Sequence, residues 1–90
     1  MIEVAFSSSF KRSLKRALKG NLARRQRFEE ALSAFVTDPF AEVLRTHKLS
    51  GRLKGNWSFT IEYDLRVVFR FIEPDRAIFE DIGSHDEVYS

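Results

Sequence analysis

The chain has 90 residues, of which 43% are hydrophobic and 31% are charged, and it contains no cysteine. This length predicts one domain over residues 1–90, and the nine Phe supply enough apolar material to argue against disorder. The lack of Cys excludes disulfides, thiolate metal ligands and a cysteine nucleophile. No apolar run reaches the roughly 20 residues that span a bilayer, and no signal peptide is recognisable, so we expect a cytoplasmic protein with no membrane partner.

The net charge of +2 conceals a strong asymmetry along the chain. Residues 1–28 carry eight Lys and Arg against one acid, whereas residues 73–90 carry six acids against one Arg. A basic segment of this kind is typical of surfaces that bind phosphate backbones. A solvated helix face is the simpler interpretation, because most runs of charge have no other role.

The first forty residues predict one strand and two helices. Residues 2–6 form a short β-type segment, and the serines at 7–9 offer N-caps for a helix. That helix has an apolar stripe on one side, while the opposite side carries Lys11, Arg12, Lys15, Arg16 and Lys19. Gly20-Asn21 ends it, and a second helix over residues 22–36 completes an antiparallel hairpin.

The middle of the chain is predicted to be irregular. Asp38-Pro39 stops the second helix, because the residue before a proline is disfavoured in helical conformation. A short helical turn is then expected to cap the core with Phe40, Val43 and Leu44. Residues 49–56 are polar and contain two glycines, so they predict a loop.

The last third predicts three strands. Residues 57–63 alternate between apolar and polar side chains, with Tyr63 on the same half-buried face as Phe59. Residues 65–72 and 77–82 follow, joined by a turn at Pro74. Gly83 is expected to release the chain into a tail that can fold back over the sheet. The three strands should form an antiparallel meander covered on one face by the helix hairpin, giving an α+β fold.

Two arginines are candidates for stabilising a phosphodiester during cleavage. Arg66 and Arg70 lie on one face of the second meander strand, four residues and so about 13 Å apart. Guanidinium groups on a rigid strand suit the negative charge that gathers on phosphate oxygens. Ion pairs with Glu62 or Glu80 across the sheet are an equally good explanation of either arginine alone.

Two histidines are candidates for acid–base chemistry. His85 follows the last strand, near Asp86 and Tyr89, and histidine changes its charge near neutral pH. His47 precedes the loop and could be its partner, but the sequence does not say whether the two converge. Metal binding is not expected, because two histidines without matched carboxylates make a poor ligand set.

The remaining cations and aromatics have competing interpretations. The loop cations Lys48 and Lys54 could hold phosphates, whereas Arg52 is better explained as a solvated side chain. Trp57 shares the alternation of Phe59, so core packing explains it best. Tyr89 lies near the chain end, where burial is least assured, and is the better candidate for stacking on a base.

Several motifs in the second half of the chain resemble the RelE/ParE toxin superfamily. They are His47-x-Leu49, Leu53-Lys54-Gly55, Trp57-Ser58, Asp64-x-Arg66-Val67 and the terminal Ile82-Gly83-Ser84-His85-Asp86-x-Val88-Tyr89. Within it the chain is most similar to RelE- and YafQ-like mRNA interferases of bacterial type II toxin–antitoxin systems. The resemblance implies their RelE-like fold over the whole chain, although the first half matches only in its pattern of elements.

The resemblance also implies an activity and partners. Such toxins enter the ribosomal A site and cut mRNA, the ribose 2′-OH attacking the adjacent phosphate to leave a cyclic phosphate and a free 5′-OH. The reaction needs a base, an acid and cations, with no metal and no cofactor. The ribosome, mRNA and a cognate antitoxin protein are therefore the expected partners.

The implied roles fall on individual residues. His85 matches a catalytic histidine that acts as general acid or base, Arg66 an arginine that stabilises the phosphorane, and Asp64 an assisting turn carboxylate. Further catalytic matches are His47 and Tyr89. RNA contacts are expected from Lys48, Lys54, Arg70, Lys11, Arg12, Lys15 and Arg16. The affinity that these contacts give should fall as the salt concentration rises.

The chain departs from the YafQ-like pattern at two positions. Thr60 stands where many members have a histidine, and Asp81 stands where a basic residue is usual. We therefore keep two alternatives to the nuclease: a ParE-like inhibitor that binds DNA gyrase without cleavage chemistry, and a degenerate toxin that only binds its antitoxin. The terminal His85 favours the nuclease, because a binding inhibitor has no need of a titrating group there.

Overall fold

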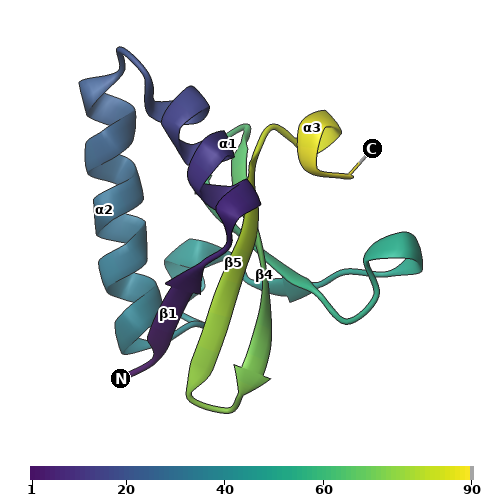
Figure 1. The fold of residues 1–90 in the computed structure, drawn as a ribbon. Helices are drawn as coiled ribbons and strands as arrows, with labels where there is room; N and C mark the ends of the chain where they lie inside the picture. The colour runs from purple at the N-terminus through teal and green to yellow at the C-terminus, as the bar shows by residue number, and fades with distance from the viewer. Residues whose placement is uncertain (90) are drawn as a thin grey trace.

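The computed structural model describes residues 1–89 and has the predicted α+β fold (Figure 1). Its strands are β1 Glu3–Phe6, β2 His47–Lys48, β3 Trp57–Glu62, β4 Leu65–Glu73 and β5 Arg76–Gly83. Its helices are α1 Ser8–Leu18, α2 Leu22–Thr37 and α3 His85–Tyr89, with short 3₁₀ turns η1 Glu42–Leu44 and η2 Gly51–Leu53.

The strands form one sheet in the order β1-β5-β4-β3-β2. The predicted meander β3-β4-β5 is antiparallel, and β1 adds to its far side in parallel with β5. The two-residue strand β2 pairs antiparallel with β3, placing His47 opposite Ser58. This edge strand precedes the predicted loop and is too short to show an alternating pattern in the sequence.

The helix hairpin forms for the predicted reasons. The Ser7 hydroxyl accepts the backbone N–H of Phe10 and caps α1, and Asn21 caps α2 by accepting the N–H of Arg24. Gly20 separates the helices with a positive φ of 67°, as expected for a glycine that follows a helix. The cations of α1 are exposed, as predicted.

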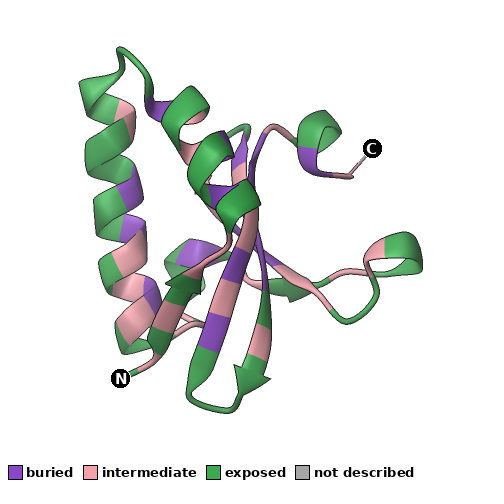
Figure 2. Cartoon of the chain, viewed as in Figure 1, coloured by how far each residue is buried: buried purple, intermediate pink, exposed green. Residues whose placement is uncertain are grey.

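The core lies between this hairpin and one face of the sheet. Figure 2 shows buried positions along α1 and α2 and along the strands behind them. The centre of the core is a cluster of aromatic rings around Phe35. The centroid of the Phe35 ring lies 5.2 Å from that of Phe59, 4.8 Å from that of Phe69 and 5.1 Å from that of Phe79. All four side chains are fully buried.

Two predictions of burial were wrong. Tyr63 is 95% exposed, because β3 ends at Glu62 and a register shift after Thr60 turns the chain before it reaches the core. Only Leu44 caps the core from the 3₁₀ turn, whereas Phe40 and Val43 are exposed. Phe40 instead packs on the rings of Trp57 and Phe71 at the rim of the sheet.

Candidate functional site

The tail predicted after Gly83 forms the short helix α3, and a capping box starts this helix. The backbone N–H of Ser84 donates to Glu87 Oε1 at 2.8 Å, and the N–H of Glu87 donates to Ser84 Oγ at 3.2 Å. Each residue thus satisfies the other's backbone donor at the open end of the helix. Hydrogen bonding from the Ser84 backbone N–H, and secondly from the Ser84 hydroxyl, holds the pKa of the Glu87 carboxyl below its usual value.

Gly83 allows α3 to fold back on the sheet. Its φ is not positive, so the reason for glycine is space rather than backbone conformation. A Cβ at this position would lie 2.9 Å from Glu87 Oε1 and 3.1 Å from Glu87 Cβ. The chain after Gly83 therefore folds back over the sheet, as the sequence allowed, but it does so as a helix in close contact with that glycine.

The helix folds over the sheet face opposite the hairpin. Val88 of α3 and Val68 of β4 are both buried, yet neither belongs to the aromatic core on the hairpin side. Val68 pairs with Ser58 on β3, and side chains paired across strands share one face of a sheet. On this side of the sheet, α3 forms part of the lining of a hollow.

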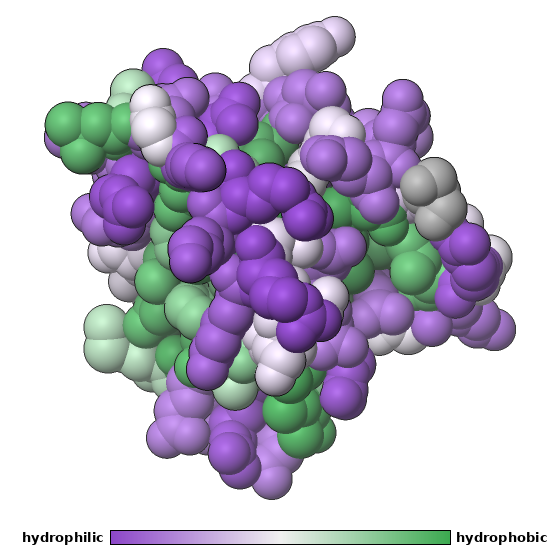
Figure 3. Space-filling view, turned by 45° about the horizontal axis from the view of Figure 1, so that its top comes forward, coloured by the Kyte–Doolittle hydropathy of each residue, from purple (hydrophilic) through white to green (hydrophobic). Residues whose placement is uncertain are grey.

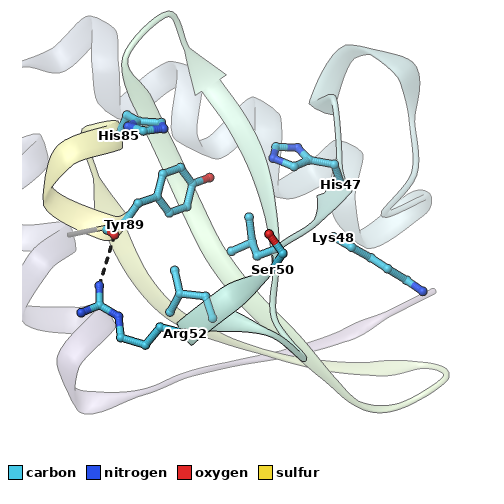
Figure 4. Close-up of a pocket in the computed structure, with 8 residues that line it drawn as sticks. His47, Lys48, Ser50, Arg52, His85 and Tyr89 are labelled. Atoms are coloured by element: carbon cyan, nitrogen blue, oxygen red, sulfur yellow. Dashed lines mark hydrogen bonds between the residues drawn. The ribbon is translucent and has the colours of Figure 1, made fainter.

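The hollow, called here the α3 hollow, has a volume of about 390 Å³ (Figure 4). Two segments far apart in the sequence line it: β2 with the following turn, and α3. The lining residues are His47, Lys48, Leu49, Ser50, Arg52, Leu53, His85 and Tyr89. The structure therefore brings together His47 and His85, whose convergence the sequence left open.

His47 is oriented by the backbone before it. Its Nδ1 lies 3.0 Å from the carbonyl oxygen of Arg45, and a carbonyl can only accept, so Nδ1 carries the hydrogen in this bond. Arg45 adopts a left-handed conformation, with φ 52° and ψ 43°, which is uncommon for a residue other than glycine. In the neutral ring, Nε2 is then the atom able to accept a proton.

His85 is the first residue of α3 and is held by its neighbours. Its backbone N–H donates to Asp64 Oδ1 at 3.2 Å, and its Nδ1 lies 3.6 Å from Asp86 Oδ1. The edge of its ring meets Tyr89, with centroids 4.5 Å apart and planes at 82°. In Figure 4 the two histidines stand on either side of the Tyr89 ring.

Tyr89 is tied at both ends. Its hydroxyl donates to Ser58 Oγ at 2.7 Å, and its carbonyl accepts from Arg52 Nη2 at 3.1 Å. Although burial was least assured for a residue near the chain end, Tyr89 is half-buried and bonded to two distant segments. Arg52 is exposed, as expected for a solvated cation, and this bond to Tyr89 also joins η2 to α3.

Comparisons with known proteins identify the fold and the family. Residues 2–90 match the profile of the family described as "Bacterial toxin of type II toxin-antitoxin system, YafQ". This chain belongs to the YafQ toxin family. The RelE/YafQ-like resemblance seen in the sequence is confirmed. No curated protein sequence is similar enough to count as a match.

Three solved structures illustrate the likeness to the YafQ family and its relatives. YafQ from Escherichia coli BL21(DE3) superposes over the whole of both chains with a TM-score of 0.82 at 17% identity. The E. coli DinJ–YafQ complex gives a TM-score of 0.76 at 18% identity, again over both whole chains. A metal-bound toxin from Helicobacter pylori gives 0.79 at 23% identity, covering 98% of this chain and 99% of that one.

At these identities the solved structures establish the fold of the YafQ-family chain and nothing finer. Within residues 1–89, no group of three or more His, Cys, Asp or Glu side chains is arranged to hold a metal ion. In the same part of the chain, no helix is both long and apolar enough to cross a membrane.

In this YafQ-family chain, Asp64 connects Arg66 to α3. Asp64 Oδ1 accepts the backbone N–H of His85 and lies 3.9 Å from Arg66 Nη1. Arg66 is opposite Gly83 on β5 and Thr60 on β3, so it shares the sheet face of α3 but does not line the hollow. The alternative ion pair between Arg66 and Glu62 does not form, because the Glu62 carboxylate binds Arg24 and Arg27.

The other predicted cations are spread over several surfaces. Arg70 pairs with Glu80 at 3.5 Å, which is the alternative explanation considered for it. Lys48 lines the hollow, but its ammonium points away in Figure 4 and lies 5.5 Å from the Trp57 ring centroid. Lys54 is exposed.

The basic residues of α1 lie away from the α3 hollow. Lys11 and Lys15 line a groove of about 530 Å³ together with Leu14 and Leu18. Arg16 faces a crevice that also contains Asp64 and Glu87. Figure 3 shows several apolar areas on one side of the molecule, separated by hydrophilic side chains.

Sequence reasoning missed Ser58 and Arg52 as parts of the site. Ser58 was assigned only to the polar side of a strand, and nothing local distinguishes it from Thr60. The helix that brings Tyr89 to them did leave a signal, because Ser84-x-x-Glu87 before Val88 is a capping-box pattern.

Proposed function

We propose that this YafQ-family toxin is a ribosome-dependent endoribonuclease that cuts mRNA in the A site. The observation that carries the proposal is the meeting of His47 and His85 in the α3 hollow. They are the two histidines of the chain, and they come from segments almost forty residues apart. General acid–base cleavage needs two such groups on one scissile bond.

The chemistry is an internal transfer that needs no metal and no cofactor. A base removes the proton from the ribose 2′-OH, whose oxygen attacks the adjacent phosphorus. The bond from phosphorus to the 5′ oxygen breaks, and an acid protonates that oxygen. A 2′,3′-cyclic phosphate and a free 5′-OH result, with one proton taken up and one released.

The ring atoms of the two histidines favour His47 as the general base and His85 as the general acid. Nδ1 of His47 is engaged with the Arg45 carbonyl, which leaves Nε2 to accept the 2′-OH proton. His85 then supplies the proton to the leaving oxygen, with its side chain 61% exposed and so accessible to a substrate. Tyr89, between the two rings, gives the flanking base a surface to stack on.

Cations complete the proposed site. Arg66 stabilises the charge on the pentacoordinate phosphorus, and Asp64 aligns it by bridging the guanidinium and the α3 backbone. Contacts with the RNA backbone are assigned to Lys48, Lys54 and Arg70. The exposed cations of α1, Lys11, Arg12, Lys15 and Arg16, are assigned to ribosomal RNA.

A cognate antitoxin is the proposed protein partner. The related E. coli YafQ has been crystallised with DinJ, and membership of a toxin–antitoxin family makes a partner of this kind the natural expectation here. The predicted cytoplasmic location follows from action on ribosomes.

The test is to add the protein to a reconstituted translation reaction and to map the 5′ ends of the mRNA. We expect ribosome-dependent cuts within the A-site codon, strongly slowed in His85→Ala and Arg66→Ala. Arg76→Ala is the matched control, because Arg76 pairs with Glu3 at the opposite end of the sheet. Intact mRNA would refute the nuclease, and a gyrase supercoiling assay would then distinguish a ParE-like inhibitor from a degenerate toxin.

A further inference from the structure

Ser58 is a buried polar residue whose side chain points at the proposed site rather than at the core. It is fully buried, and its neighbours across the sheet are His47 on β2 and Val68 on β4. Only Ser13 is also buried among the polar and charged residues of the described chain. A buried hydroxyl requires a hydrogen-bond partner, and Ser58 finds one in Tyr89 at 2.7 Å.

This bond fixes the ring of Tyr89 in space. The backbone of Tyr89 is already held on α3, and Arg52 binds its carbonyl. The hydroxyl bond secures the far end of the side chain, so the ring cannot rotate away without breaking it. The ring therefore has a fixed position between the two histidines (Figure 4).

The fixed ring in turn limits the imidazole of His85. The two rings meet edge to face at 4.5 Å, whereas the Asp86 carboxylate, at 3.6 Å, is beyond hydrogen-bond distance. The side of His85 that faces the α3 hollow is thus set mainly by Tyr89. Ser58 lies on β3, inside the sheet. This strand is a rigid support for the contacts from Ser58 to Tyr89 and from Tyr89 to His85.

We propose that Ser58 is a positioning residue, which orients His85 for proton transfer by holding Tyr89 through its hydroxyl. The inference rests on the proposed nuclease function for its catalytic consequence, but not for its geometry. It assigns a role to a residue that contacts no reacting atom. It also gives the Tyr89 hydroxyl a function distinct from that of its ring.

The first test is a pair of variants that each remove one end of the bond. Ser58→Ala removes the acceptor, and Tyr89→Phe removes the donor while keeping the ring. We expect each to lower kcat for ribosome-bound mRNA by about 10- to 100-fold with KM little changed, because misplacement of a catalytic group affects the chemical step. The double variant should be no slower than the slower single variant, since both remove one interaction.

A matched control separates positioning from loss of a buried serine. Ser13→Ala removes the other buried hydroxyl, which lies on α1 and outside the hollow, and should leave kcat unchanged. Thermal unfolding of all variants establishes that the comparison is made on folded protein.

The second test does not depend on cleavage. The Tyr89 ring shifts the NMR resonances of the adjacent His85 ring protons, so their chemical shifts report its position. We expect the same displacement in Ser58→Ala and Tyr89→Phe and none in Ser13→Ala. Unchanged His85 shifts in both site variants would overturn the proposal, as would losses of kcat that multiply in the double variant. If the wild type cuts no mRNA, the proposed function fails while the NMR result still decides the positioning role.

Discussion

The two faces of the sheet are held in different ways. On the hairpin face, Phe35, Phe59, Phe69 and Phe79 pack in a closed aromatic cluster with no exposed surface. On the other face, α3 is held by a capping box, by the bond between Asp64 and His85 and by the bond from Tyr89 to Ser58. One face depends on apolar volume, whereas the other depends on a few directed bonds.

The difference explains where the site can form. Apolar packing is non-directional and tolerates no cavity, so it is suited to stability but offers no chemistry. Directed bonds fix the positions of particular atoms, which is what acid–base chemistry requires. Substitutions should therefore separate the two faces, with large effects on stability on one side and local effects on the other.

Phe35→Ala should have the largest effect. It removes a ring that contacts three others and leaves a cavity, so the free energy of unfolding should fall by about 3–5 kcal/mol in urea titrations. Phe40→Ala is the matched control, because that ring is 53% exposed and should cost only about 1 kcal/mol. Equal losses in the two variants would contradict the account of the core.

Gly83→Ala should act on α3 with a smaller cost. The added methyl group would meet Glu87 at 2.9–3.1 Å, and such overpacking costs about 1–3 kcal/mol. Hydrogen exchange should show lost protection of the Val88 amide, which donates to the Ser84 carbonyl, while the amides of β4 stay protected. Unchanged protection at Val88 would show that α3 accommodates the methyl group.

Ser84→Ala should remove the cap of α3 alone. Loss of an N-cap side chain costs about 1 kcal/mol, and here it should appear as faster exchange at the Glu87 amide, which donates to the hydroxyl. Ser33→Ala, on the exposed side of α2, is the control and should not affect α3. A uniform change of exchange across the chain would argue that α3 is not a local unit.

The smallest effect should be a pH dependence of the capping box. The pKa of Glu87 lies below its ordinary value of 4.5 because the Ser84 N–H and hydroxyl bind the carboxylate side of the box. A lowered folded pKa means that the stabilisation is present above 4.5 and is lost as the pH falls through the folded pKa. Exchange at Glu87 should rise relative to the core as the pH falls below 4.5 and through the folded pKa, and Glu87→Gln should abolish this relative rise.

Much of the fold could be predicted because the helix hairpin and meander are encoded locally. Phe10 and Leu18 recur at helical spacing, and Phe59 alternates with Ser58 and Thr60, so periodicity identified both faces. Tyr63 and Phe40 were wrongly predicted to be buried. The exposure of Tyr63 follows from a register shift in β3, and that of Phe40 from the geometry of the turn before η1, and both depend on tertiary structure. The alternation pattern contains no information about either.

The candidate site was less predictable because distance in sequence hides it. His47 and His85 were identified by their residue type, yet their meeting depends on the pairing of β2 with β3 and on the fold-back of α3. Ser58 and Arg52 act only through Tyr89, so neither could be distinguished before α3 was placed. The Ser84-x-x-Glu87 pattern was the one local signal that could have revealed that helix.

The most direct test of the central claim is the single-turnover cleavage rate on programmed ribosomes for His47→Ala, His85→Ala and the double variant. If the two histidines act as one acid–base pair, each single variant should lose about 10²- to 10⁴-fold in rate, and the double variant should be little slower than the slower single one. A wild-type rate in either single variant, or losses that multiply in the double variant, would contradict a shared site in the α3 hollow.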